Sequence, residues 1–175
     1  DVFIITSPIG THFKYLRYAY EANKDIIIEK PIVENLNQFK KLLTLNKKFK
    51  KKILIHHNDL LNFEKNKILK KFRKINNLRK IEMIYGKREH YNSYKKPFFD
   101  WLPHPLAIIT NLFGKPNKFK ILKYKKMKTK SKIIEYLDLS FTLNNFEVFL
   151  HFSNNIDKPS KKIIFYENKK KKIYD

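Results

Sequence analysis

An aspartate and a histidine, Asp100 and His104, lie four residues apart at the entry to a segment with helical spacing. Residues four apart lie on the same side of a helix, so both side chains can face one site. A histidine that a carboxylate holds in one tautomer exchanges protons near neutral pH, which is the chemistry of a general acid or base. A purely structural interpretation also fits, in which Asp100 caps the helix and His104 is an ordinary half-buried histidine.

Polar side chains follow three short apolar runs in the first third of the chain. They are TSP at residues 6–8, EKP at 29–31 and HHN at 56–58. Any one of them alone would fit a solvated loop. In open α/β sheets, however, ligands bind outside the carboxyl ends of the strands. Three such groups on one edge therefore predict a ligand-binding cleft there.

Strand and helix patterns alternate over residues 1–58. Apolar runs at 2–6, 25–29 and 51–58 predict strands, and helical spacing predicts helices over 13–24 and 36–48. Thr11 is expected to be the N-cap of the first helix. Apolar residues Leu36, Phe39, Leu42 and Leu43 stand at helical spacing in the second. The order β-α-β-α-β with short connections predicts a parallel, right-handed, doubly wound sheet whose strands are covered on both faces.

The pattern changes after Asn58 and predicts a second unit. A helix is expected over 63–75 and another over 105–113, closed by Gly114. From Lys80 the strands alternate, with apolar residues at every second position of 137–143 and 146–152 around a turn at Asn144-Asn145. The lysine runs at 50–52 and 169–172 are interpreted as solvated turns. We expect an α+β domain with a large, mostly antiparallel open sheet over 59–175, after an α/β domain over 1–58.

The formal net charge of +23 comes from 39 lysine and arginine residues against 16 aspartate and glutamate residues. Such a charge suits nucleic-acid binding, because phosphate contacts use lysine and arginine. However, only four of the basic residues are arginine, and the lysines are spread along the whole chain. This usage is typical of AT-rich coding sequence. We therefore expect non-specific attraction to polyanions at low salt, without a specific nucleic-acid site.

The absence of cysteine excludes a disulfide framework and thiolate chemistry. The apolar runs are too short to span a bilayer and no leader pattern precedes them, so we expect a cytoplasmic protein. Asp1 stands directly before an apolar strand pattern. We therefore expect the chain to be a piece of a longer protein.

Four segments together carry a resemblance to a known family. Read in order, DVFIITSPIGTH, AYEANKDIIIEKPI, ILIHHN and DWLPHPLAIITNLFG look like the Gfo/Idh/MocA oxidoreductases, with agreement across about residues 1–115. The resemblance implies the C-terminal part of a Rossmann NAD(P)-binding domain followed by a substrate and oligomerisation domain, incomplete at its C-terminus. It also implies hydride transfer between NAD or NADP and a sugar or polyol carbon. No metal site is expected.

The resemblance assigns roles to individual residues. Lys30 would lie by the reacting carbon, where its ammonium group orients the hydroxyl and stabilises developing alkoxide. His104 would take the proton, with Asp100 beside it. Asn58 and Trp101 would contact the substrate. The residues expected to contact the cofactor are Thr6, Ser7, Pro8, His12, Glu29 and Lys30.

The chain departs from the family pattern at several positions. The G-x-G-x-x-G turn that holds pyrophosphate is absent. Leu102 stands where the family has glycine, Ala107 where an aspartate is frequent, and Leu60 or Leu61 where an arginine is expected. An alternative is therefore a catalytically degenerate, basic protein that binds nucleic acid or an anionic glycan. For the enzyme we expect a small-molecule substrate, no membrane partner and a homo-oligomer formed through the open sheet.

Overall fold

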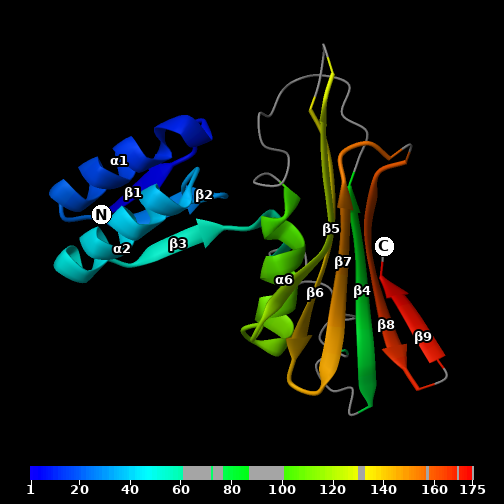
Figure 1. The fold of residues 1–175 in the computed structure, drawn as a ribbon. Helices are drawn as coiled ribbons and strands as arrows, with labels where there is room; N and C mark the ends of the chain where they lie inside the picture. Colours follow the sequence, from blue (N-terminus) through cyan, green and yellow to red (C-terminus); the bar gives the residue numbers. More distant parts are fainter. Residues whose placement is uncertain are drawn as a thin grey trace. The chain divides into compact units, whose positions relative to one another are not determined.

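The computed structural model describes residues 1–60, 72, 77–86, 101–129, 133–156, 158–168 and 170–174. The chain divides into two compact units, Asp1–Asn58 and Asp59–Asp175. Each unit has its own sheet (Figure 1). Each also has its own buried core. Asp100 and nearly all of the helix predicted over 63–75 lie outside the described residues. None of the described helices is long and apolar enough to cross a membrane.

The first unit has the predicted β-α-β-α-β order, and its three strands form one parallel sheet. β1 pairs with β2 and β2 pairs with β3, which gives the strand order β1-β2-β3. Parallel neighbours need a crossover connection, and a helix supplies each one. The elements are β1 (Val2–Ile5), α1 (Ile9–Glu21), β2 (Asp25–Glu29), α2 (Leu36–Phe49) and β3 (Ile53–His56).

Both helices of the first unit pack against the same face of its sheet. Leu16 of α1 and Leu42 of α2 share one buried cluster with Ile28 of β2. On the opposite face, Ile4 and Leu54 are 63% and 61% exposed. The prediction of a doubly wound sheet covered on both faces is therefore wrong for the described residues. Two right-handed crossovers that advance in the same direction place both helices on one side.

The two helices begin differently. α1 begins at Ile9 after Pro8, and the hydroxyl of Thr11 lies in its first turn, where it donates to the carbonyl of Pro8. The prediction of Thr11 as N-cap is therefore wrong. α2 has a side-chain cap, because Oδ1 of Asn35 accepts a hydrogen bond from the backbone N–H of Gln38.

The apolar positions of α2 do not form one buried face. Leu42 is buried, whereas Leu36, Phe39 and Leu43 are exposed. The helical spacing of the four residues correctly predicted the helix, but only one of the four positions is buried. Helical spacing places residues on one side of a helix, but the rest of the fold decides how much of that side is covered.

The second unit contains a six-stranded sheet with the strand order β5-β6-β7-β4-β8-β9. Every neighbouring pair is antiparallel except β4 and β7, which are parallel. This confirms the predicted large, mostly antiparallel sheet. The elements are β4 (Leu78–Gly86), α6 (Pro103–Phe113), β5 (Phe119–Lys128), β6 (Ile133–Leu143), β7 (Phe146–Ser153), β8 (Ser160–Glu167) and β9 (Lys170–Tyr174).

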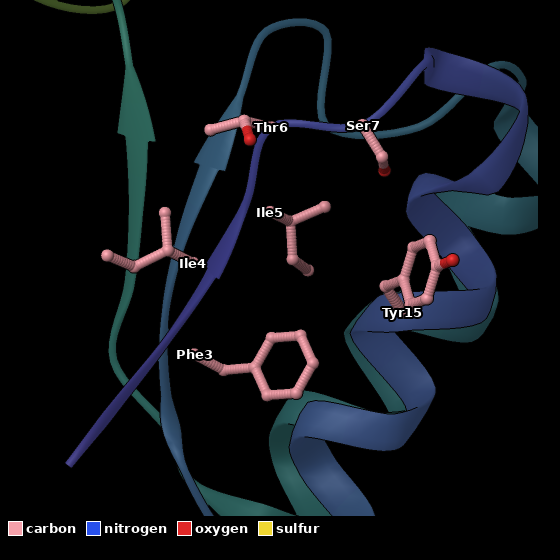
Figure 2. A pocket seen from close by; sticks show the side chains of 6 residues that line it. All are labelled: Phe3, Ile4, Ile5, Thr6, Ser7 and Tyr15. Atoms are coloured by element: carbon pink, nitrogen blue, oxygen red, sulfur yellow. The ribbon is translucent and has the colours of Figure 1, made fainter.

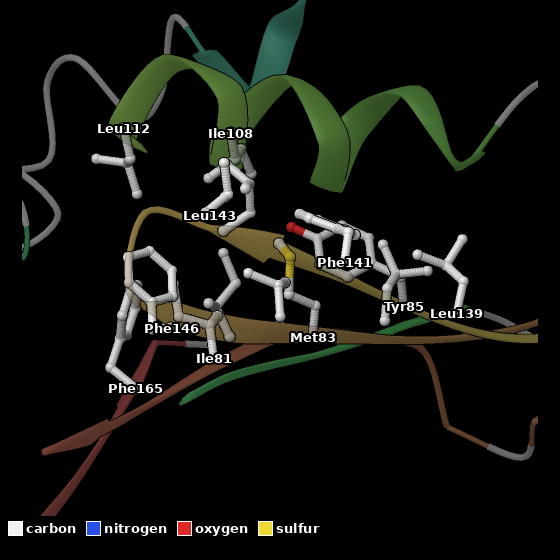
Figure 3. Close-up of a cluster of buried hydrophobic side chains, with 14 of the residues drawn as sticks. Ile81, Met83, Tyr85, Ile108, Leu112, Leu139, Phe141, Leu143, Phe146 and Phe165 are labelled. Atoms are coloured by element: carbon white, nitrogen blue, oxygen red, sulfur yellow. The ribbon is translucent and has the colours of Figure 1, made fainter. Parts of the chain in front are cut away.

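The core of the second unit lies between α6 and one face of the six-stranded sheet. Ile108 and Leu112 point from α6 toward sheet residues such as Met83 (Figure 3). Gly114, at φ 88°, follows the helix as predicted. The predicted alternation is confirmed, because the apolar positions of β6 and β7 are buried: Leu137, Leu139, Phe141, Leu143, Phe146, Val148, Leu150 and Phe152.

Two lysine-rich segments differ from expectation. β5 is a regular strand that the sequence did not predict, and all ten of its residues are exposed. Residues 170–172 belong to β9, so their interpretation as a turn is wrong. The reversal between β8 and β9 is instead at Asn168, which has a φ of 37°. A lysine run is compatible with a strand at the edge of a sheet, where charged side chains discourage pairing with other chains.

Candidate functional site

The carboxyl ends of the parallel strands meet along one edge of the first sheet. The register places Ile5 beside Ile28 and Glu29 beside His56, so the residues after each strand are neighbours at this edge. Carboxyl edges of this kind bind ligands in open α/β sheets. The predicted cofactor residues found here are Thr6, Ser7, Pro8, Glu29 and Lys30.

Glu29 and His56 form a contact that the sequence interpretation missed. Oε1 of Glu29 lies 2.6 Å from Nδ1 of His56, and about a third of each side chain is exposed. The two residues end neighbouring strands in register. The carboxylate of Glu29 is therefore already engaged by an imidazole, and its position beside Lys30 is fixed. The signal in the sequence was the occurrence of an ionisable residue at the end of both strands.

A groove of about 260 Å³ runs beside β1 and contains two predicted cofactor residues. Figure 2 shows Phe3 and Ile5 directed toward α1, with Ile4 on the other side of the strand. The volume is below that of typical small-molecule pockets, so the groove has room for only part of a dinucleotide. The lining residues are Phe3, Ile4, Ile5, Thr6, Ser7 and Tyr15.

His12 lies under this edge instead of opening onto it. Its side chain is 1% exposed. Nε2 lies 2.8 Å from the carbonyl oxygen of Ser7, and Nδ1 lies 3.0 Å from that of Pro31. Both ring nitrogens therefore face backbone atoms, although His12 was expected to contact the cofactor.

In the second unit, His104 pairs with a carboxylate, and that carboxylate is Asp59. Nδ1 of His104 lies 2.7 Å from Oδ2 of Asp59, and both side chains are largely buried. His104 is in the first turn of α6, while Asp59 begins the unit. The expected partner, Asp100, lies outside the described residues. No local spacing in the sequence indicates the pair with Asp59.

Asp59 also contacts an ammonium group. Nζ of Lys161, on β8, lies 3.1 Å from Oδ1 of Asp59 and 5.7 Å from the ring centre of Trp101. The ring of Trp101 lies 6.3 Å from that of His104. The structure thus brings two predicted residues, Trp101 and His104, together with two that were not predicted.

These contacts explain the acidity of Asp59. The hydrogen bond from His104 is the main reason why the pKa of Asp59 falls from its ordinary 3.8 to about 2. Burial acts in the opposite direction, and Lys161 adds to the lowering. The carboxylate therefore stays ionised, 2.7 Å from Nδ1 of His104.

A separate polar cluster lies on the face of the second sheet that alternates with the core face. His151 places Nδ1 2.7 Å from Oδ1 of Asp138 and Nε2 3.3 Å from Oε1 of Glu82. The hydroxyl of Tyr136 donates to Asp138, and that of Tyr166 donates to Glu82. The cluster spans β4, β6, β7 and β8 and was not predicted. The described residues contain no group of histidine, aspartate and glutamate side chains suited to a metal ion.

The predicted site residues are divided between the two units. Lys30 and Asn58 belong to the first unit, and Trp101 and His104 belong to the second. Asn58 is exposed at the end of its unit. Each unit thus has its own set of polar groups: an ionisable edge in the first, and a histidine held by a carboxylate in the second.

Solved structures share the fold of nearly the whole chain. An oxidoreductase from Bacillus cereus matches 96% of this chain with a TM-score of 0.72 and 19% identity. Biliverdin reductase from Synechocystis sp. PCC 6803, in complex with biliverdin and NADP+, matches 99% with a TM-score of 0.76 and 15% identity. These matches cover 50% and 59% of the two solved chains, so this chain spans about half the length of its structural relatives. No curated protein matches it.

A family model matches the first unit. It describes the Gfo/Idh/MocA oxidoreductase family with its NAD-binding Rossmann fold, and it matches residues 1–57. This segment carries the parallel sheet and the ionisable carboxyl edge. The resemblance seen in the sequence is thereby confirmed for residues 1–57, which match the model of the Gfo/Idh/MocA oxidoreductase family with its NAD-binding Rossmann fold.

Proposed function

We propose that this chain is part of an NAD(P)-dependent oxidoreductase that moves a hydride between the nicotinamide and a hydroxyl-bearing carbon of a sugar or polyol. The observation that carries the chemistry is the 2.7 Å contact between Asp59 and His104. The family match of residues 1–57 supports the cofactor. Hydride chemistry belongs to the nicotinamide, so the protein supplies binding, orientation and proton transfer.

The residues at the carboxyl edge fit one end of such a cofactor. Ser7, Glu29 and Lys30 offer a hydroxyl, a carboxylate and an ammonium group, which suit the ribose and nicotinamide. The three glycines of these 175 residues are Gly10, Gly86 and Gly114, so none forms the G-x-G-x-x-G turn that cradles pyrophosphate. We therefore assign this chain the nicotinamide end of the cofactor, without a choice between NAD and NADP.

Proton transfer is the task of His104. Oxidation of an alcohol releases a proton, and Nε2 of His104 accepts it while Nδ1 stays with Asp59. The carboxylate stabilises the imidazolium that forms. Lys30, as a cation, orients the hydroxyl and stabilises negative charge that develops on its oxygen. Asn58 and Trp101 are proposed to contact the substrate.

The experiment is a cofactor and substrate screen of the purified protein. NADH and NADPH binding is measured by fluorescence, and turnover is measured with sugars and polyols. Biliverdin is included because one structural relative binds it. Lys30→Ala and His104→Ala should each lower kcat by about 10²-fold or more, while Lys170→Ala, an exposed control on β9, should not. Wild-type rates in both site variants would reject the assigned roles, and turnover of biliverdin alone would reject the sugar or polyol.

The second candidate function is a basic binding protein, and the observation that favours it is the lysine-rich, fully exposed strand β5. Sequence-specific binding to RNA or DNA that persists near physiological salt would support this candidate. Weak, uniform binding that disappears with salt would indicate charge alone.

For the enzyme, we propose a homo-oligomer through the face of the second sheet that carries His151, which sedimentation of the wild type and of His151→Asp would test.

A further inference from the structure

His12 is an almost completely buried imidazole in the first unit. It lies on α1 and is 1% exposed. The other buried polar residues, Glu135 and Asn154, belong to the second unit and bond to each other through the Glu135 backbone N–H. A buried polar group is retained at little cost only when it is hydrogen-bonded.

The ring of His12 contacts the chain on both sides. Nε2 lies 2.8 Å from the carbonyl oxygen of Ser7, and Nδ1 lies 3.0 Å from the carbonyl oxygen of Pro31. A carbonyl oxygen only accepts hydrogen bonds, so the ring is the donor in each contact that forms. A ring with one N–H serves one of the carbonyls, and a ring with two serves both.

These two carbonyls belong to the loops that follow neighbouring strands. Ser7 follows β1, and Pro31 follows β2 and directly succeeds Lys30. The strand register extends only to the pair Ile5 and Ile28, before either loop begins. The ring of His12 therefore bridges the two loops beyond the end of the sheet.

We propose that His12 is a positioning residue that couples the Ser7 loop to the Lys30–Pro31 loop and so holds Lys30 in place at the carboxyl edge. The inference deepens the proposed function and rests on it for the importance of Lys30. The proposal is based on the buried ring, which lies between the carbonyl oxygens of Ser7 and Pro31. An apolar side chain in its place would offer neither carbonyl a donor. Such a loss frees the loops, because an unsatisfied buried carbonyl is more stable when it turns to water.

The test is amide hydrogen exchange in the purified protein, without cofactor, over residues 6–11 and 29–34. His12→Phe keeps a ring and removes both ring nitrogens. It should raise exchange by about fivefold or more in both segments. His12→Gln keeps one donor group and should restore protection in part. The matched control is Tyr20→Phe, which lies on α1, is fully buried, and loses only a hydrogen bond to Asn46.

The outcomes separate the coupling from general loss of stability. The proposal is supported if exchange rises in both loops for His12→Phe and does not rise for Tyr20→Phe. The comparison requires that the two variants shift the melting temperature equally. Unchanged exchange over 29–34 in His12→Phe overturns it, as does equal exchange in both variants. If His12→Phe does not fold, His12→Gln decides: protection equal to that of wild type in both loops overturns the coupling.

Cofactor measurements distinguish this inference from the proposed function. In an active protein, His12→Gln should lower kcat more than it raises the KM for cofactor, since the expected defect is the placement of Lys30. If wild type binds neither NADH nor NADPH while the exchange result holds, the proposed function fails and the loop coupling stands. If the cofactor binds and exchange over 29–34 does not respond, only the coupling fails.

Discussion

Oδ2 of Asp59 and Nδ1 of His104 lie 2.7 Å apart, although the two residues are far apart in the sequence. The contact gives His104 an orienting carboxylate from outside its own helix. The same carboxylate binds Lys161 on the opposite oxygen. A single carboxylate thus contacts both an imidazole and an ammonium group, and the loss of that carboxylate affects both.

Asp59→Asn should lower activity without unfolding the protein. The amide keeps the shape of the carboxylate but cannot stabilise an imidazolium, so kcat should fall by about 10²-fold or more. Steady-state kinetics measure the change. The matched control is Asp138→Asn, which removes the carboxylate from a different histidine, His151, on the other face of the sheet. A similar loss in both variants would contradict a specific role for Asp59.

The pair should also make stability depend on acid pH. The pKa of Asp59 is about 2 in the folded protein and 3.8 ordinarily. A lowered pKa means that the folded state favours the carboxylate, so the contribution is present above about pH 4 and disappears as the pH falls toward 2. Urea unfolding should show Asp59→Asn less stable than wild type by about 1–2 kcal/mol at pH 6. A difference that persists unchanged at pH 2 would contradict this origin.

The hydrophobic pattern of the sequence predicted strands correctly where only one face of the sheet is buried. The alternation of Leu137, Leu139 and Phe141 identified the core face of β6, because a half-buried strand has a period of two. The same reasoning was misleading for Ile4, since a continuous apolar run does not reveal which faces are covered. β5 was missed because its frequent lysines hide the strand pattern.

The site was less predictable than the fold. The carboxyl edge followed from strand order, but the pairs Glu29–His56 and Asp59–His104 join residues whose proximity depends on tertiary structure. His12 is recognisable as a polar residue near a helix start. Its burial between two carbonyls depends on the loop after β2, which the sequence of α1 does not contain.

The cluster around His151 should be visible in the titration of Tyr136. The hydrogen bond to Asp138 is the main reason why the pKa of Tyr136 rises to about 12, with burial second. Asp138→Asn should bring this pKa down toward 10, as measured by NMR of ¹³C-labelled tyrosine. Because a raised pKa favours the protonated phenol, the hydrogen bond stabilises the fold below pH 10 and is lost as the pH approaches 12. Tyr166, whose pKa is raised mainly by Glu82, should change less; an unchanged Tyr136 would contradict the assignment.

Gly86 should be intolerant of a side chain. A Cβ atom at this position would lie 1.9 Å from the backbone oxygen of Ser153, its partner in the β4–β7 pairing. Gly86→Ala should therefore destabilise the protein by about 3 kcal/mol, because backbone must move. Gly10→Ala is the control, since the nearest atom there lies 3.9 Å away and alanine favours the helix. Chemical denaturation compares the two, and equal stability would contradict the close approach.

The first sheet should promote self-association of this chain. β1 is an edge strand of the described sheet, and Ile4 and Val2 are 63% and 51% exposed. An apolar edge strand offers backbone groups and side chains to another chain. Ile4→Lys should reduce association in sedimentation experiments, because it places a charge beside that edge. Leu36→Lys, at an equally exposed apolar residue on α2, should have a smaller effect. A monodisperse wild-type monomer would contradict the prediction, and equal effects of the two lysines would indicate general hydrophobic attraction instead of edge pairing.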